Sequence, residues 1–113
     1  MPLKSKLFRN VKELEAAAVS HPAHIVPGAI GPHVALIQQA LVALDGACIA
    51  TVELETERYG PSTAQAVLNY KKMRRIINFT YQKTADNIVG KMTIEALDQG
   101  MVRLEQTIHT HRN

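Results

Sequence analysis

The sequence reads YGPSTAQAV at residues 59–67 and VGKMTIEAL at residues 89–97. Each stretch has an apolar or aromatic residue, Gly, two variable residues, Thr, two variable residues, Ala and an aliphatic residue. Glycine allows a sharp turn and a close approach of the backbone to a neighbour, and the Thr that follows falls in the first turn of a helix. The repeated pattern therefore predicts two equivalent loop-to-helix corners in one small core.

Length and composition indicate one globular domain. The chain has 113 residues, of which 46% are hydrophobic and 20% charged, as is usual for soluble domains. The net charge of +3 is compatible with contact to an anionic surface without selecting one. No apolar run has the length of a signal peptide or approaches the roughly 20 residues that span a membrane.

Four segments have apolar residues at helical spacing: 4–19, 32–45, 61 to the low seventies, and 91 onward, with fraying expected in the final HTHRN. Pro32 and Pro61 are suited to a first helical turn, and Gly46 to a left-handed helix end. Residues 20–32 read as an irregular connector and 78–87 as a loop. Residues 47–58 favour a short strand or an extended loop, because β-branched residues alternate there.

Two residues have side chains that resemble nucleophiles. Thr63 is interpreted as a local helix cap, because no His or carboxylate lies close in sequence to activate its hydroxyl. Cys48 is the only cysteine, which excludes an internal disulfide. Its neighbours are not electropositive, so we expect a buried, unreactive thiol.

Three clusters of ionisable residues allow alternatives to a purely structural role. The histidines at 21, 24, 33, 109 and 111 lack the spacing of a structural zinc site, so we expect surface histidines and no metal or other cofactor. Glu53, Glu55 and Glu57 alternate; a carboxylate pair for glycoside cleavage is conceivable, but a solvated edge or loop is the preferred interpretation. The stretch YKKMRR, 70–75, is interpreted as a solvated helix end, and a DNA-reading helix is not expected.

The combined pattern resembles the peptidoglycan-binding-like domain of bacterial cell-wall hydrolases. The first helix supplies Val34, Ile37-Gln38 and Leu41; the second supplies Tyr59-Gly60-Pro61-Ser62-Thr63, Ala66-Val67 and Tyr70; the third supplies Asp86 to Gly90, Thr93 and Leu97. The chain departs from the family where Glu57-Arg58 replaces Asp-Gly, Lys71 replaces Gln and Asn87 replaces Gly, and its segment 72–85 is longer than the usual connector.

The resemblance implies an all-α fold with a three-helix core at 31–99. An N-terminal amphipathic helix and connector, 1–30, precede this core, and a C-terminal helix extension and tail, 100–113, follow it. The resemblance also implies a bacterial protein. Without a leader in this chain, we expect it to be cytoplasmic as encoded or to reach the cell envelope by a signal-independent route.

The function implied by the resemblance is non-catalytic recognition of peptidoglycan or another cell-wall glycopeptide. Sugars and peptide stems are expected to bind a shallow groove between the two corners and their loops, contacting Tyr59, Ser62, Asn69, Tyr70, Arg74, Tyr81, Asp86 and Asn87. The alternative is a protein-interaction or assembly scaffold in a secretion system, a toxin or a phage-related particle, with a protein partner bound through the terminal helices.

Overall fold

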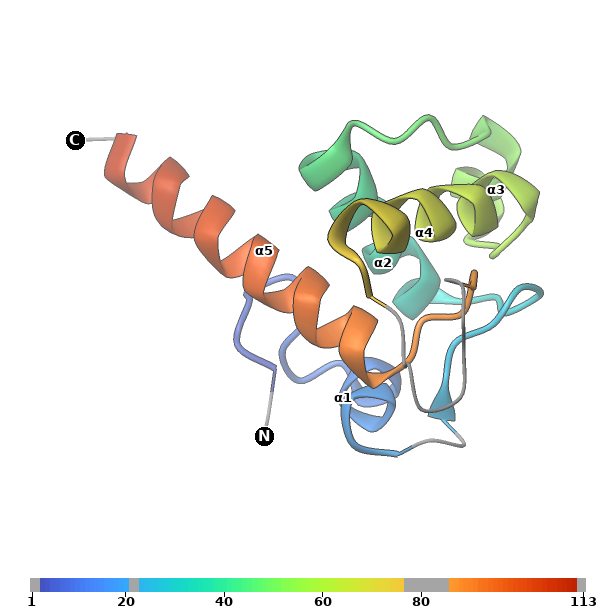
Figure 1. Ribbon diagram of the computed structural model, residues 1–113, viewed down its shortest axis with the longest axis horizontal. Coiled ribbons are helices and arrows are strands. Elements are labelled where there is room, and N and C mark those ends of the chain that lie inside the picture. The colour runs from blue at the N-terminus through green and yellow to red at the C-terminus, as the bar shows by residue number, and fades with distance from the viewer. Residues whose placement is uncertain (1–2, 21–22, 77–85, 112–113) are drawn as a thin grey trace.

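The computed structural model describes residues 3–20, 23–76 and 86–111. Within these residues the chain forms five α-helices and two isolated β-bridges (Figure 1). The predicted all-α class is therefore confirmed. Tyr81 and most of the loop predicted at 78–87 lie outside the described residues.

Helix α2, Pro32–Asp45, has the predicted ends. Pro32 occupies the first turn, where its missing N–H costs no helical hydrogen bond. Gly46 follows the helix with φ 63°, and its N–H bonds to the carbonyls of Leu41 and Val42. This left-handed exit is the one expected for glycine.

Helices α4, Pro61–Arg74, and α5, Lys91–His111, are the helices of the two repeats. Both begin where the repeat predicts. Arg75, the residue that follows α4, adopts φ 54°. Helix α5 continues through residues 109–111, which the sequence predicted to be frayed.

The connector at residues 20–32 forms backbone hydrogen bonds with both corners. Ile25 exchanges two backbone hydrogen bonds of 2.9 Å with Val89, the residue before Gly90. Tyr59, the residue before Gly60, donates its N–H to the carbonyl of Ala29 at 2.8 Å. The segment therefore supplies the backbone partners of both corners, which explains why the two copies lie in one core.

The corner glycines are needed for space and not for a left-handed conformation. Gly60 has φ −98°, and Gly90 is not among the positive-φ residues. A Cβ added to Gly60 would lie 2.6 Å from Cδ of Glu53, and one added to Gly90 would lie 2.9 Å from the ring of His24. Only a residue without a side chain allows these approaches.

The helix predicted over 4–19 is wrong in its first half. Helix α1 spans only Lys12–Val19, and Asn10 adopts φ 66° before it. The carboxylate of Asp98 accepts the N–H groups of residues 4 and 5 at 2.8–3.1 Å, and Glu105 accepts those of residues 6 and 7. These distant acceptors on α5 satisfy the backbone donors without a continuous helix.

The strand or extended loop considered for 47–58 is also wrong in its centre. Residues Thr51–Thr56 form helix α3, and Glu57, which follows the helix, has φ 54°. The hydroxyl of Ser62 accepts the N–H of Ala50 at 2.8 Å, at the start of the helix. A tertiary contact from α4 therefore supports a helix too short to be stable alone.

The core is continuous from the N-terminal segment to α5. Helix α5 packs against α1 and α2, and α2 also packs against α4. The largest buried apolar and aromatic side chains come from all of these parts of the chain: Phe8, Leu14, Ile37, Leu41, Tyr59, Tyr70, Ile94 and Leu97. The N-terminal segment therefore shares the core of the repeats.

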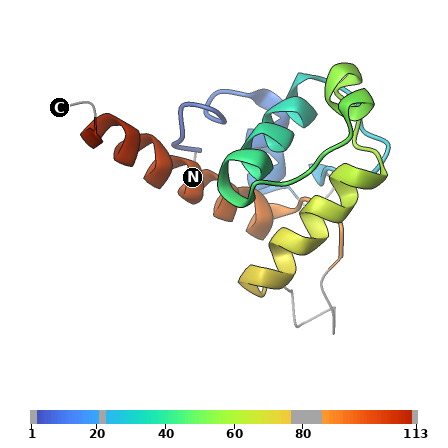
Figure 2. The ribbon, with the colours of Figure 1, turned by 90° about the horizontal axis from the view of Figure 1, so that it is seen from above.

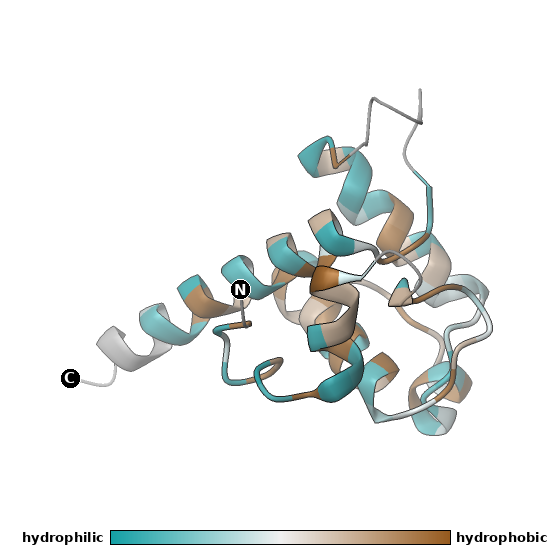
Figure 3. Ribbon diagram, turned by 90° about the horizontal axis from the view of Figure 1, so that it is seen from below, coloured by the Kyte–Doolittle hydropathy of each residue, from teal (hydrophilic) through white to brown (hydrophobic). Residues whose placement is uncertain are grey.

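Helix α5 extends beyond the rest of the molecule. Its C-terminal turns project from the body in two perpendicular views (Figures 1 and 2). Hydrophilic and hydrophobic residues alternate along it, as in an amphipathic helix (Figure 3). Within the described part of the chain, no helix is both long and apolar enough to cross a membrane.

Candidate binding site

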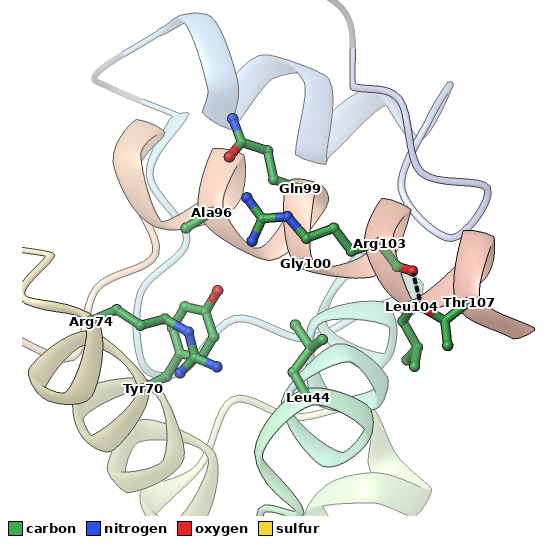
Figure 4. A pocket seen from close by; sticks show the side chains of 9 residues that line it. All are labelled: Leu44, Tyr70, Arg74, Ala96, Gln99, Gly100, Arg103, Leu104 and Thr107. Atoms are coloured by element: carbon green, nitrogen blue, oxygen red, sulfur yellow. Dashed lines mark hydrogen bonds between the residues drawn. The ribbon is translucent and has the colours of Figure 1, made fainter.

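An open hollow of about 480 Å³ lies between the last turns of α2 and α4 and the middle of α5 (Figure 4). Ligand sites commonly measure roughly 300–1,000 Å³. The described residues that line it are Leu44, Tyr70, Arg74, Ala96, Gln99, Gly100, Arg103, Leu104 and Thr107. This lining combines aliphatic and aromatic surface with two guanidinium groups and no carboxylate.

Arg74 is held in place on the α4 side of the hollow. Its two terminal nitrogens donate to the two carboxylate oxygens of Asp45 at 3.1 and 2.8 Å. Its guanidinium also lies 3.8 Å from the centroid of the Tyr70 ring. The bidentate hydrogen bond to Asp45 raises the pKa of Arg74. Asp45 also largely neutralises the positive charge of Arg74.

Arg103 is the second cation, and it lies on the α5 side. It makes no ion pair with any residue that the structure describes. In Figure 4 its side chain runs along α5 toward Ala96. The positive charge of Arg103 is therefore not locally neutralised, in contrast to that of Arg74.

Tyr70 provides a neutral phenol in the hollow. Burial raises the pKa of its hydroxyl, as does Asp45, while Arg74 and Arg103 oppose that increase. Figure 4 shows the hydroxyl pointing toward α5. Tyr70 is buried, and the Arg74 guanidinium lies over its ring, so Tyr70 forms part of the buried wall of the hollow and brings no negative charge to it.

Gly100 lets Leu44 reach the surface of α5. A Cβ at Gly100 would lie 2.9 Å from Cδ1 of Leu44. Glycine in a helix interior costs about 1 kcal/mol relative to alanine, and this contact gives the physical reason for accepting that cost. The close approach creates the aliphatic part of the hollow.

A buried polar network lies at the first corner. Nε2 of Gln38 donates to the Thr63 hydroxyl at 3.0 Å, and that hydroxyl donates to Glu53 at 2.8 Å. Glu53 also accepts the N–H groups of Ser62 at 3.0 Å and Thr63 at 2.9 Å. Burial alone would raise the pKa of Glu53, but these hydrogen bonds outweigh it and lower the pKa to about 2.

This network corrects two interpretations of the sequence. Glu53 is 3% exposed and caps the start of α4, so it is not a solvated edge residue. Thr63 makes no local cap and instead joins Glu53 to Gln38. Because all three side chains are buried, the network stabilises the corner.

Tyr59 and Asn87 join the two corners. Tyr59 is buried, and its hydroxyl donates to the backbone carbonyl of Asn87. Burial raises the pKa of this hydroxyl, and the negative charge of Asp86 adds to the effect. Tyr59 is therefore a neutral core residue in the structure.

Lys71 is buried and not part of a solvated helix end. Its ammonium group pairs with Asp86 at 2.5 Å and donates to the carbonyl of Ile88 at 2.9 Å. The residue that departs from the family pattern therefore ties α4 to the loop before α5. The remaining basic part of YKKMRR, residues 72–75, is exposed, as predicted.

The structure brings only some of the predicted site residues together. Tyr70 and Arg74 line the hollow. Tyr59, Ser62, Asn69, Asp86 and Asn87 are not among its lining residues. Asn69 is exposed and accepts a hydrogen bond from Gln65 at 2.9 Å, while Ser62 contacts Ala50.

Cys48 is exposed, and the prediction of a buried thiol is wrong. Its neighbours Ala47 and Ile49 pack against the core, so the residue between them faces outward in this extended connection. Among the described residues, no group of three or more His, Cys, Asp or Glu side chains is arranged to hold a metal ion.

Leu44, Gly100, Arg103 and Leu104 were not predicted as site residues. Leu44 and Leu104 lie at helical spacing within the segments predicted at 32–45 and from 91 onward, and Gly100 is a glycine inside the second of these segments. Arg103 carries no local signal, because its place in the lining depends on the position of α4 relative to α5.

Comparison with known proteins gives no assignment: no family model, no curated protein and no solved structure matches the chain significantly.

Proposed function

We propose that the chain is a non-catalytic recognition module that binds bacterial cell-wall glycopeptide in the hollow between α2, α4 and α5. The observation that carries the proposal is the lining of this hollow, in which an aromatic ring, aliphatic side chains and a guanidinium group without an ion-pair partner among the described residues lie together. Peptidoglycan offers matching chemistry, since its peptides combine small aliphatic side chains with carboxylates. The resemblance of the doubled corner to wall-binding domains supports the same ligand.

The burial of two residues that could have taken part in catalysis also supports a binding role. Thr63 has a nucleophile-like hydroxyl and Glu53 belongs to the alternating carboxylates considered for glycoside cleavage, and both are buried and hydrogen-bonded to one another. Both therefore contribute to the fold in this proposal, and the ligand is bound without chemical change.

The test is co-sedimentation of the full chain with purified sacculi at low and at physiological salt. We expect the protein to pellet with sacculi and to remain in solution without them. Ala96→Phe fills the hollow and should reduce pelleting, whereas Gln65→Ala changes an exposed residue of α4 outside the hollow and should not. A chain that stays in solution at low salt would refute wall binding. Equal pelleting of Ala96→Phe would refute the hollow as the site.

A protein-interaction scaffold is the second proposal, and the projection of α5 from the body favours it (Figure 2). A secretion-system, toxin or phage-related partner would bind this helix. A pull-down from the native host separates the two proposals. One dominant protein that is lost when residues 108–113 are deleted supports the scaffold, while recovery of muropeptides supports wall recognition.

A further inference from the structure

We infer that the hollow recognises the free carboxylate end of a wall peptide, with Arg103 as the carboxylate-binding residue and the aliphatic lining as the subsite for a small apolar side chain. This inference rests on the proposed function, because it specifies which part of the wall polymer occupies the hollow.

The charges around the hollow favour an anion. Arg74 already binds both oxygens of Asp45, whereas Arg103 has no ion-pair partner among the described residues. None of the described residues that line the hollow carries a carboxylate. A guanidinium presents several N–H groups in one plane, which matches the geometry of a carboxylate.

The hydrogen-bonding groups favour a peptide end over a sugar chain. Each sugar hydroxyl needs an acceptor as well as a donor, and arginine has only donors. Among the lining residues, the Thr107 hydroxyl donates its only hydrogen to the carbonyl of Arg103 at 3.0 Å and keeps its acceptor lone pairs, while the Gln99 side chain is directed away from Tyr70 in Figure 4. Arg103 by itself offers several N–H donors and no acceptor. The lining is therefore richer in donors than in acceptors, which suits a carboxylate.

The apolar lining favours a small side chain next to that carboxylate. Leu44, Ala96 and Leu104 come from two helices and line the hollow beside Gly100 (Figure 4). Burying a methyl or short alkyl group there removes apolar surface from water. Inorganic phosphate offers the charge but not this contact, so it should bind more weakly.

The test is a titration of the ¹⁵N-labelled full chain, followed by NMR, with N-acetyl-D-alanyl-D-alanine. Its C-terminal amide, the L,L form, an N-acetylglucosamine oligomer and inorganic phosphate are titrated in parallel. We expect the D,D acid to shift the resonances of Gly100 and Arg103. The amide should bind about tenfold more weakly or worse, because it loses a charge-assisted interaction.

Variants separate recognition from net charge. Arg103→Gln should weaken binding of the acid by about tenfold, and Arg103→Lys should restore part of it. Arg9→Gln removes the same charge from an exposed residue outside the hollow and should leave binding unchanged. Because Arg103 is exposed, all three variants should keep the helical circular dichroism spectrum.

The outcomes distinguish this inference from the proposed function. If sacculi are bound but the acid and the amide bind equally, or neither binds, the carboxylate inference is refuted and wall recognition stands. Binding of only the oligosaccharide or only phosphate would likewise refute the carboxylate inference and leave wall recognition standing. Preference for the L,L acid would refute the wall peptide in favour of a protein C-terminus. Failure to bind sacculi refutes both.

Discussion

Glu53→Gln tests whether a single buried carboxylate holds the first corner. The substitution keeps the size of the side chain but replaces an acceptor oxygen with an N–H₂ group. That group would face the N–H of Ser62 or the N–H and hydroxyl of Thr63, which now donate to the carboxylate at 2.8–3.0 Å. A donor would then oppose a donor in a site that is 3% exposed.

The pKa of Glu53 sets the size of the expected effect. It is lowered from 4.5 to about 2, and one unit corresponds to about 1.4 kcal/mol. The ionised carboxylate therefore stabilises the fold by about 3 kcal/mol at neutral pH, out of a total of roughly 5–15 kcal/mol for a domain. Since Gln resembles the protonated acid, Glu53→Gln should lose a similar amount.

The sign of the pH dependence follows from the lowered pKa. The stabilisation is fully present above pH 4.5 and is lost as the pH falls through the folded-state value of about 2. At pH 3 the same relation leaves about 1.5 kcal/mol. The difference between wild type and variant should therefore shrink by about half between pH 7 and pH 3.

The assay is urea denaturation followed by circular dichroism at pH 7 and pH 3. Glu55→Gln is the matched control, because it removes the same charge from an exposed residue of α3 and should change stability by less than about 0.5 kcal/mol. A loss below about 0.5 kcal/mol for Glu53→Gln at pH 7, or an equal loss at pH 3, would refute the reasoning.

Three further substitutions test other parts of the fold. Glu57→Gly should stabilise the chain by about 0.5–1 kcal/mol in thermal unfolding, because Glu57 has φ 54°; a lower melting temperature would contradict this. Gly60→Ala should destabilise it by more than about 2 kcal/mol, since its Cβ would meet Glu53 at 2.6 Å; unchanged stability in urea would show that the carboxylate can move away. Asp98→Asn should speed amide hydrogen exchange at Ser5, whose N–H it accepts at 2.8 Å; unaltered exchange would mean that other contacts hold the N-terminal segment.

Local signals predicted the helices of the repeats but not the two segments that depend on distant partners. Pro32, Pro61 and Gly46 act within one helical turn, so the starts of α2 and α4 and the end of α2 could be read directly. The first half of 4–19 has a helical pattern, yet its N–H groups bond to Asp98 and Glu105. No local pattern reveals an acceptor so far along the chain.

The candidate site was predictable only in part for the same reason. Tyr70 and Arg74 were predicted from one helix, and both line the hollow. Arg103 was missed, because a surface arginine on a helix has no distinctive sequence signal. Its significance comes from Arg74 already being paired with Asp45.

The sequence by itself determined that the chain is helical and that two Gly–Thr–Ala corners begin two of its helices, because dihedral preferences and apolar periodicity act over a few residues. Only the tertiary structure decided what each corner contacts: Gly60 meets Glu53, and Gly90 meets His24. Tertiary packing likewise decided that Leu44, Tyr70 and Arg103 line one hollow. Such contacts join residues far apart in the chain, so they are set by how the helices pack.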